Sequence, residues 1–280
     1  MAASVLFRGA GDLVSGSIRR AHLAHLRVAC TELAEPLCVR RLVSYSEAVY
    51  EGRITVEGVT AVRVEPDGLD GAWSRGEVPV VVDPGLSILD QRPFDVLVDG
   101  TMAKRNLGTR IDHASRVIAL GPGFAAGRDC HAVVETLAGH DLGRVIYEGS
   151  AAADTGVPGP PEAYLGPPSA CCSGASPWDA ILLRAPCDGT FRGRAAIGDL
   201  VEEGRVLGDV DGEPIRAGVR GVVRGLIRDG RAVTRGLKIG DVDPTCEPRR
   251  ATTISEKSNA IAGGVLEAIL TLSREASTGR

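Results

Sequence analysis

Short apolar runs, separated by glycine-rich and charged turns, dominate the first 150 residues of the chain. Runs rich in Val, Ile and Leu are typical of strands buried on both faces of a sheet. The pattern predicts strands at 4–8, 27–31, 78–83, 94–99 and 116–120. Alternating positions over 54–64 predict a hairpin or a meander around Glu57-Gly58. Further strands over 131–137 and 144–149 give this part a β-rich end.

Apolar residues with the spacing of a helix are less frequent in the chain. This spacing predicts a helix from the turn at 9–16 to about His25, and short helices near 69–75 and 86–92. Ser44, with Glu47 three residues later, indicates the start of a short helix over 44–51. A longer helix within 254–273 is weakened at its start by Gly263-Gly264. Strands alternating with helices predict an α/β Rossmann-like domain with a mostly parallel core over 1–150.

The sequence then changes character. Residues 151–179 are dense in Pro, Gly, Ala and Ser and contain Cys171-Cys172, so we expect a linker with exposed reduced thiols rather than a redox device. From 180 to 245 the chain repeats with an offset of 32 residues, as Gly198 with Gly230 and Gly204 with Gly236 show.

A repeat of this length cannot bury its own apolar face, but two copies packed together can. Residues 180–245 therefore resemble the all-β barrel-sandwich of lipoyl and biotinyl carrier domains. The hairpin that carries the modified lysine in those carriers has no lysine here, over 211–216, so we expect an unmodified packing or docking module. The expected organisation is completed by a C-terminal helix, within 246–280, that packs back.

Composition narrows the setting of the protein. The chain has 280 residues, a net charge of −4 and no basic block, which speaks against a nucleic-acid partner. No apolar stretch reaches the roughly 18 residues of a membrane span, and the start lacks the features of a signal peptide. Seven cysteines without regular spacing favour reduced thiols and a cytoplasmic protein.

The turn after the first strand is a candidate nucleotide site. A strand, a glycine turn, a helix, a second strand and an acidic residue follow one another, which is how open parallel sheets hold a dinucleotide. In this interpretation the turn would surround a pyrophosphate, and Glu32 would accept hydrogen bonds from a ribose. Helix–strand packing alone would also explain the glycines. The residues assigned to the pyrophosphate are Gly9, Gly11, Asp12, Ser15 and Gly16.

A second candidate site follows the strand that ends at Asp99. The loop supplies cationic and polar groups for a phosphate or another anion; they are Lys104, Arg105, Asn106 and Thr109. The next cluster contains His131, Glu135, His140 and Arg144, which could line the same cleft. The histidines and Glu135 are candidates for acid–base catalysis. Their spacing does not match a zinc motif, so we expect no metal site, and satisfied structural hydrogen bonds are the competing explanation.

Long motifs resemble the YqeB-like family, whose members are accessory proteins of selenium-dependent molybdenum hydroxylase systems. The chain is more distantly similar to the XdhC-type chaperones of the molybdenum cofactor. The resemblance covers almost the whole chain and rests on GAGDLVSG at 9–16, EPLCVRRLVSYSEAVYEG at 35–52, MAKRNLGTRID at 102–112, GPGF at 121–124 and HAVVETLAGHDLGRVIYEG at 131–149.

This resemblance implies a maturation factor for a molybdenum hydroxylase. Its ligand would be NAD(P) or the molybdenum-pterin dinucleotide, and its partner the hydroxylase apoprotein. The alternatives are a stand-alone NAD(P)-dependent oxidoreductase and a docking scaffold without catalysis. The sequence leaves open whether a reaction is catalysed and whether the chain forms a homo-oligomer.

Overall fold

A computed structural model describes residues 3–154 and 181–278, with side chains up to Ser273. These residues form two compact units. The first contains the described parts of 3–36, 44–154 and 254–278, and the second contains 37–43 and 181–253. Most of the predicted linker, with Cys171 and Cys172, lies outside the described residues. The predicted domain boundaries stay a prediction.

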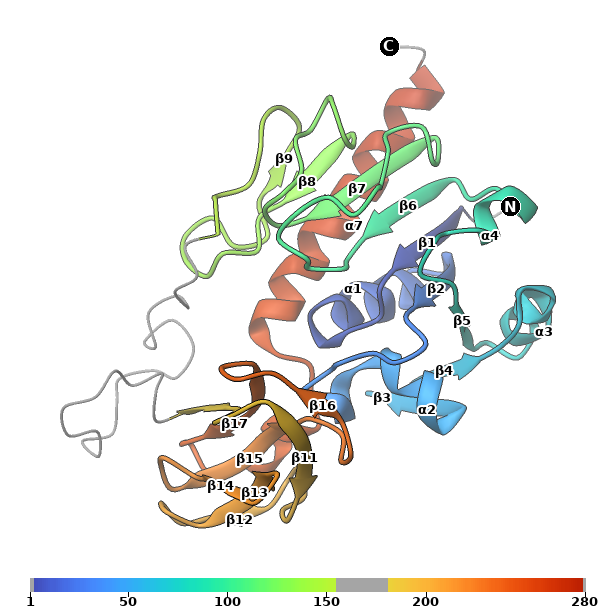
Figure 1. The fold of residues 1–280 in the computed structure, drawn as a ribbon. Helices are drawn as coiled ribbons and strands as arrows, with labels where there is room; N and C mark the ends of the chain where they lie inside the picture. The colour runs from blue at the N-terminus through green and yellow to red at the C-terminus, as the bar shows by residue number, and fades with distance from the viewer. Residues whose placement is uncertain (1–2, 155–180, 279–280) are drawn as a thin grey trace. The chain divides into compact units, whose positions relative to one another are not determined.

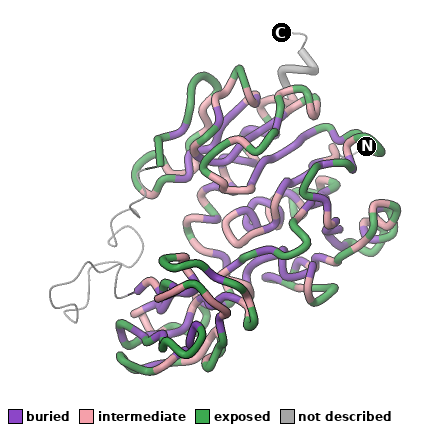
Figure 2. Tube along the Cα trace, in the orientation of Figure 1, coloured by how far each residue is buried: buried purple, intermediate pink, exposed green. Residues whose placement is uncertain are grey.

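A nine-stranded sheet forms the centre of the first unit (Figure 1). Seven neighbouring strands run parallel, and one strand at each edge pairs antiparallel. In spatial order the strands are β3 (Arg53–Val56), β4 (Val59–Arg63), β5 (Val78–Val82), β2 (Arg27–Glu32), β1 (Ser4–Arg8), β6 (Val96–Asp99), β7 (Arg116–Leu120), β8 (Ala132–Val134) and β9 (Val145–Ile146). The inner strands are almost completely buried (Figure 2), as their apolar runs predict.

Two long helices lie side by side and cover one face of this sheet (Figure 1). They are α1 (Asp12–Leu23), close to the start of the chain, and α7 (Glu256–Thr278), at its end. Both bury aliphatic side chains, among them Ile18 of α1 and Ile261 of α7. The helix predicted within 254–273 is therefore confirmed, and it completes the core of the unit that the first residues begin.

Loops and short helices cover the opposite face. Of the short helical segments, α3 (Leu69–Ser74) and α4 (Ile88–Gln91) contribute Leu69 and Ile88 to that face, and η3 (Pro66–Gly68) precedes α3. The other two, η2 (Tyr45–Glu47) and α2 (Ala48–Glu51), follow one another, and η2 contacts α1. Leu6 and Leu97 from the middle strands pack with Leu69, Phe94 and Phe124 from these connections. No helix among the described residues has both the length and the hydropathy needed to cross a membrane.

The predicted fold class is wrong in this respect. A Rossmann-like domain needs a mostly parallel sheet with helices on both faces. Here the sheet is mixed, because β3 and β9 pair antiparallel at its edges. The described connections over 100–115 and 121–131 contain no helix, so loops and only short helical segments cover the second face. The molecule has one large mixed sheet and two small antiparallel sheets, which fits an α/β class only in part.

The second unit consists of two four-stranded antiparallel sheets around one apolar core. The first sheet is β10 (Leu182–Arg184), β17 (Lys238–Asp243), β15 (Gly221–Leu226) and β12 (Leu200–Val201). The second sheet is β14 (Glu213–Arg216), β13 (Val206–Val210), β11 (Gly189–Gly193) and β16 (Ala232–Val233). Two short 3-10 helices, η1 (Arg41–Val43) and η4 (Pro248–Ala251), complete this unit.

The 32-residue repeat relates these two sheets to each other. An offset of 32 residues turns β11 into β15, β12 into β16 and β13 into β17. The same offset brings β10 onto β14, so each strand of one sheet has its counterpart in the other. The unit therefore has an internal pseudo-twofold relation, and neither repeat forms a sheet alone.

Glycines set how closely α7 approaches the first unit. A Cβ on Gly264 would collide with the carbonyl oxygen of Gly143, and a Cβ on Gly143 would lie 2.5 Å from the carbonyl oxygen of Ala260. A Cβ on Gly263 would meet only the end of the Arg20 side chain, at 3.5 Å. The glycine pair lowers the helix propensity of α7. Gly264 is nevertheless required, because the backbone of α7 meets the backbone of Gly143 there.

We therefore expect opposite effects from two neighbouring substitutions. Gly264→Ala forces the backbone at Gly143 away from α7 and lowers the free energy of unfolding by about 1–3 kcal/mol. Gly263→Ala, the matched control, leaves the packing intact and raises helix propensity, by up to about 1 kcal/mol. Urea unfolding of both variants measures the difference. Equal effects of the two substitutions would contradict the packing argument.

Candidate functional site at the carboxyl edge of the sheet

The order of the strands reverses at β1. The chain continues from β1 to β2 on one side, and β6 lies on the other side of β1. The segments that follow β1 and β6 consequently meet beyond the carboxyl ends of these strands, where open sheets bind ligands. Gly9 has φ +92°, and a Cβ on it would lie 3.2 Å from the carbonyl oxygen of Gly100. Only glycine fits at this contact between the two turns.

The peptide groups of the glycine turn are hydrogen-bonded on both sides. The Gly9 N–H donates to the carbonyl oxygen of Thr31 at 2.8 Å. The Ala10 N–H donates to Glu32 Oε2 at 2.8 Å. The Ala10 carbonyl oxygen accepts from Ser44 Oγ at 3.1 Å and from the Ser46 N–H at 2.9 Å. The turn thus has one fixed conformation, held by side chains and backbone from two other segments.

Glu32 has two partners in this arrangement. Its Oε1 accepts the Leu33 N–H at 2.8 Å, while Oε2 accepts the Ala10 N–H. Burial raises the pKa of Glu32, and the hydrogen bonds from Leu33 and Ala10 oppose this effect. The carboxyl predicted to hold a ribose therefore lies beside the glycine turn, where it binds the turn itself.

The start of α1 is held from inside the protein. Ser15 Oγ donates to the carbonyl oxygen of Gly11 at 2.9 Å and accepts the Tyr45 N–H at 3.1 Å. Ser258 Oγ of α7 accepts the Gly16 N–H at 3.2 Å and contacts the carbonyl oxygen of Leu13 at 2.8 Å. Ser15 and Gly16, both assigned to a pyrophosphate, are buried. They hold α1 against its neighbours, and Gly16 has no side chain because Ser258 occupies that space.

Gly11 differs from these two residues. It is the N-cap of α1, and no described side chain caps the helix there. No described atom lies within 4 Å of the position that a Cβ on Gly11 would take. Asp12 follows it as the first residue of α1 and is half-buried. The N-terminal end of a 12-residue helix is consequently open on the side of Gly11, with its partial positive charge directed toward that space.

A buried ion pair organises the loops beside this turn. Arg8 ends β1 and pairs with Asp99, the last residue of β6, at 3.4 Å between Nη1 and Oδ2. Arg8 also donates to Thr109 Oγ1 at 2.8 Å and to the carbonyl oxygens of Pro84 and Leu107 at 3.2 and 3.0 Å. Asp99 has no exposed surface. One guanidinium therefore fixes the loops that follow β5 and β6.

The cationic loop after β6 has a constrained backbone. Lys104 has φ +60°, a left-handed conformation that ordinary residues rarely adopt. A Cβ on Gly123 would lie 2.5 Å from the Cα of Arg105, so the turn over 121–124 packs directly on this loop. The Lys104 ammonium is exposed and pairs with Asp154 at 2.8 Å. Backbone conformations of this kind are common in ligand-binding loops.

Two other residues of this loop serve the loop itself. Asn106 Oδ1 accepts the N–H groups of Gly108 and Thr109, each at 2.8 Å. Asn106 Nδ2 donates to the Thr109 carbonyl oxygen at 2.8 Å. Thr109 Oγ1 donates to Asp99 Oδ2 and is buried. Both residues lie at the predicted place, but their polar groups bind protein rather than facing an open space.

The histidine and carboxylate cluster divides into structural and exposed groups. His131 Nδ1 accepts the Val117 N–H at 2.9 Å, and burial lowers the pKa of His131. Glu135 accepts three backbone N–H groups at 2.7 Å, from Thr136, Leu137 and Ala152. These contacts join strands and loops at the far side of the sheet, so both residues have the structural role that the sequence left open.

His140 and Arg144 are exposed, and Arg144 pairs with Asp141 at 2.7 Å. Among the described residues, no three His, Cys, Asp or Glu side chains come together in a way that could hold a metal ion. The structure therefore places the turn over 9–11 with Glu32 in one cluster, and Lys104 with Arg105 on the neighbouring loop.

Sequence reasoning missed several groups of this edge. Arg8, Asp99, Ser44, Ser46 and Ser258 organise it, yet none was proposed as a site residue. For Arg8 and Asp99 a signal existed, because each is a charged residue that ends an otherwise apolar strand. For Ser258 no signal existed, because its contact joins positions 242 residues apart.

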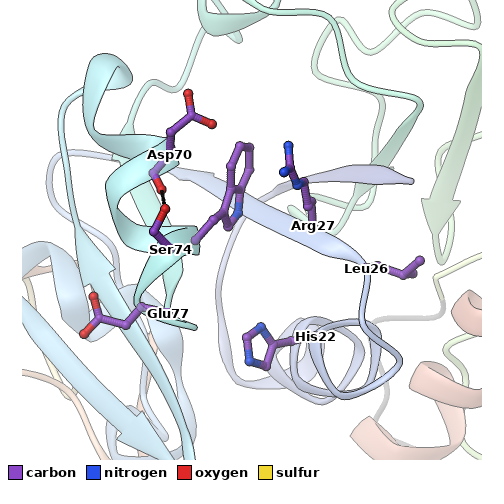
Figure 3. A pocket seen from close by; sticks show the side chains of 7 residues that line it. His22, Leu26, Arg27, Asp70, Ser74 and Glu77 are labelled. Atoms are coloured by element: carbon purple, nitrogen blue, oxygen red, sulfur yellow. Dashed lines mark hydrogen bonds between the residues drawn. The ribbon is translucent and has the colours of Figure 1, made fainter. Parts of the chain in front are cut away.

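A pocket of about 230 Å³ lies at the opposite, amino end of β2. Figure 3 shows His22 and Leu26 from the end of α1 on one side of it, with Asp70 and Ser74 of α3 on the other. The Trp73 ring, which also lines this pocket, is contacted by the guanidinium groups of Arg27 and Arg92, at 5.7 and 5.0 Å from its centroid. These contacts join α3 to the start of β2.

No family model matches the chain. The uncharacterized protein YqeB of Escherichia coli (strain K12) is 44% identical over 270 residues. The alignment covers 96% of this chain and 47% of YqeB. The chain resembles YqeB along nearly its whole length. It spans about half the length of that relative. The similarity supports the YqeB-like resemblance found in the sequence motifs.

Solved structures align only weakly. An aspartoacylase family protein from Mesorhizobium loti is 14% identical, with 86% of this chain and 85% of that chain covered and a TM-score of 0.26. The ectoine utilization protein EutE (DoeB) from Ruegeria pomeroyi, in a product-bound structure, is 12% identical with the same coverage and TM-score.

The buried ion pair at the edge yields a stability prediction. Arg8→Met leaves Asp99 buried without its counter-ion and releases two loop carbonyl groups, so we expect a loss of about 3–5 kcal/mol in the free energy of unfolding. The control is Arg110→Met, because Arg110 pairs with Asp112 in an exposed position and its loss costs about 0–1 kcal/mol. Guanidinium unfolding compares the two variants, and a similar loss in both would contradict the organising role of Arg8.

Proposed function

We propose that this chain is an accessory protein of a selenium-dependent molybdenum hydroxylase system, and that it binds a dinucleotide at the turn over 9–11. The ligand is the molybdenum-pterin dinucleotide or NAD(P), and the macromolecular partner is the hydroxylase apoprotein. The identity to YqeB supports the family part of this proposal. Since the chain spans 47% of that relative, the activity of a whole protein of that length is also part of the proposal.

The open N-terminus of α1 is the observation that carries the ligand part. Helix N-termini bind phosphate through unpaired N–H groups and the helix dipole. Gly11 leaves space for a ligand at that end of α1, while Ser15, Gly16 and Ser258 hold the rest of the first turn in place. A rigid turn with one open end is suited to binding an anion without a large ordering cost.

The neighbouring loop supplies positive charge. Lys104 and Arg105 lie on the loop after β6, which meets the glycine turn at Gly100. The Lys104–Asp154 pair is exposed on both sides, so it contributes little stability and exchanges readily for a ligand phosphate. Asp154 would then release the ammonium at a small cost, and Lys104 would carry the second phosphate contact.

Glu32 has a double role in this proposal. In the structure its carboxylate occupies the Ala10 N–H, the group that a phosphate oxygen would use. When a dinucleotide binds, Glu32 turns to the ribose diol and the Ala10 N–H becomes available to the phosphate. A ligand without a ribose would displace Glu32 from the Ala10 N–H but would form no hydrogen bond with the Glu32 carboxylate.

Binding to the glycine turn is tested with NADH, NADPH, ADP, GDP and CDP by isothermal titration. We expect the binding to the parent chain to weaken about tenfold or more in Lys104→Ala, because a charge-assisted contact contributes about 1.5–3 kcal/mol. Arg128→Ala is the matched control, since Arg128 is an exposed cation that also forms an ion pair, with Asp129. If no probe binds the parent chain, the dinucleotide proposal is wrong and the docking-scaffold alternative remains.

The role of Glu32 gives a second, differential prediction. Glu32→Ala frees the Ala10 N–H, so we expect inorganic pyrophosphate to bind roughly five- to tenfold more tightly. ADP should not gain in affinity, because it loses the carboxylate that would hold its ribose. Glu65→Ala, at an exposed carboxylate, is the control. A parallel change for both ligands would remove Glu32 from the ribose site.

A measurement of NADH turnover distinguishes the oxidoreductase alternative from the proposal. The alternative requires hydride transfer from bound NADH, together with an acid–base group. His131 and Glu135 hold backbone N–H groups in the structure, which speaks against their use as such groups. NADH binding with consumption of the cofactor in the presence of a hydride acceptor would favour the alternative.

A further inference from the structure

Residues 37–43, called the strap from here on, belong to the second unit although both flanking segments belong to the first. The strap leaves the first unit after Pro36 and returns to it at Ser44. Pro36 is fixed there, because its carbonyl oxygen accepts the Tyr50 hydroxyl at 2.9 Å. The strap is therefore a short segment of the second unit, and the residues on both sides of it in the sequence belong to the first unit.

Backbone and side-chain contacts fix the strap in the second unit. The Leu226 N–H donates to the carbonyl oxygen of Val39 at 2.9 Å, and Arg41 Nε donates to the carbonyl oxygen of Leu226 at 2.8 Å. Cys38 and Val43 are 8% and 4% exposed. The strap thus extends the hydrogen bonding of β15 at its last residue, and two of its apolar side chains are buried.

The strongest of these contacts is made by Arg40. Its Nε and Nη2 donate to Asp241 Oδ2 at 3.1 and 2.8 Å. The Asp241 side chain is 3% exposed and also pairs with Lys238 at 2.7 Å. Burial by itself raises the pKa of Asp241, and the charges of Arg40 and Lys238 outweigh it, so the pKa lies well below its usual range.

The internal repeat shows what is particular about this contact. The counterpart of Asp241, 32 residues earlier, is Asp209, which is also buried. Asp209 pairs with Arg194 of its own repeat, with Nη2 and Oδ2 2.8 Å apart. At Asp241, a pairing guanidinium comes from the strap instead. The two equivalent carboxylates are thus paired in different ways. Asp209 has a guanidinium partner from its own repeat, and Asp241 has a guanidinium partner from the N-terminal part of the chain.

The residues on both sides of the strap form hydrogen bonds with the same peptide group, that of Ala10. Before the strap, Glu32 accepts the Ala10 N–H. Directly after it, Ser44 Oγ and the Ser46 N–H donate to the Ala10 carbonyl oxygen. Four residues separate Glu32 from the strap, and none separates Ser44 from it. A displacement of the strap therefore acts on the groups that hold the turn over 9–11.

We propose that the strap couples the second unit to the glycine turn: anchoring of Arg40 to Asp241 keeps Glu32 and Ser44 in position on the Ala10 peptide. The second unit in this way controls the conformation of a turn to which it is linked by the chain. A partner that binds the second unit and displaces the strap would loosen the turn, and a ligand that stiffens the turn would stabilise the strap. This inference does not rest on the proposed function, because it concerns the chain without ligand.

Hydrogen exchange on the full chain, followed by mass spectrometry, tests this coupling. In Arg40→Ala we expect the amides of 8–16 and 44–48 to exchange about tenfold or more faster than in the parent chain, through increased local opening. Arg194→Ala is the matched control, because it removes the equivalent ion pair without touching the strap. Faster exchange confined to the strap and to 220–243 in Arg40→Ala would overturn the proposal.

A second pair of variants covers the case in which Arg40→Ala unfolds the second unit, as circular dichroism would show. Arg40→Lys keeps a positive charge near Asp241, and Arg41→Ala removes the bond to the Leu226 carbonyl oxygen while Arg40 stays in place. We expect both to raise the exchange of the 8–16 amides by a smaller factor. Unchanged exchange at 8–16 in both variants, with faster exchange in the strap, would equally overturn the coupling.

Discussion

Both sides of the Ala10 peptide are bound, and this double constraint sets the geometry of the carboxyl edge. Its N–H is held by Glu32 and its carbonyl oxygen by Ser44 and Ser46. A glycine turn has many accessible conformations when free. Here it has one, because an unpaired buried peptide group would cost about 1–3 kcal/mol on either side. The conformation of the turn is therefore decided by segments that follow it in the sequence by more than twenty residues.

The same dependence on distant segments runs through the first unit. Its first helix, α1, packs along α7, which comes from the end of the chain. Ser258 enters the first turn of α1 where Gly16 leaves room, and Gly264 meets the backbone at Gly143. Small residues at these two places set the distance of α7 from the sheet.

Local pattern was sufficient to predict most strands of the first unit, because burial and periodicity act over a few residues. The strands at 4–8, 78–82 and 116–120 lie where apolar runs predict them. The 32-residue offset likewise relates strands of the two small sheets. The fold class could not be read in the same way. Whether an edge strand pairs parallel or antiparallel, as at β9, depends on the length and path of connections that carry no periodic signal.

The predicted site residues also show what local pattern can and cannot predict. Glycine and serine in the turn over 9–16 are compatible with a phosphate site and with close packing, and the sequence alone does not separate the two. The contacts assign Ser15 and Gly16 to packing, and they leave Gly11 beside open space. Glu135 illustrates the opposite case, since its buried carboxylate accepts three backbone N–H groups and so has a structural role.

The pseudo-twofold relation of the second unit makes its one asymmetric feature informative. Two repeats that pack together need equivalent partners for equivalent buried charges, and Arg194 supplies one for Asp209 within its own repeat. The second repeat has Leu226 at the position equivalent to Arg194. Its buried Asp241 is paired by Lys238 and by Arg40 from outside the repeat. An unpaired carboxylate at that depth would be strongly unfavourable, so the repeat unit relies in part on a charge from the N-terminal part of the chain. The strap is thus a structural component of the second unit as well as a connection between two segments of the first.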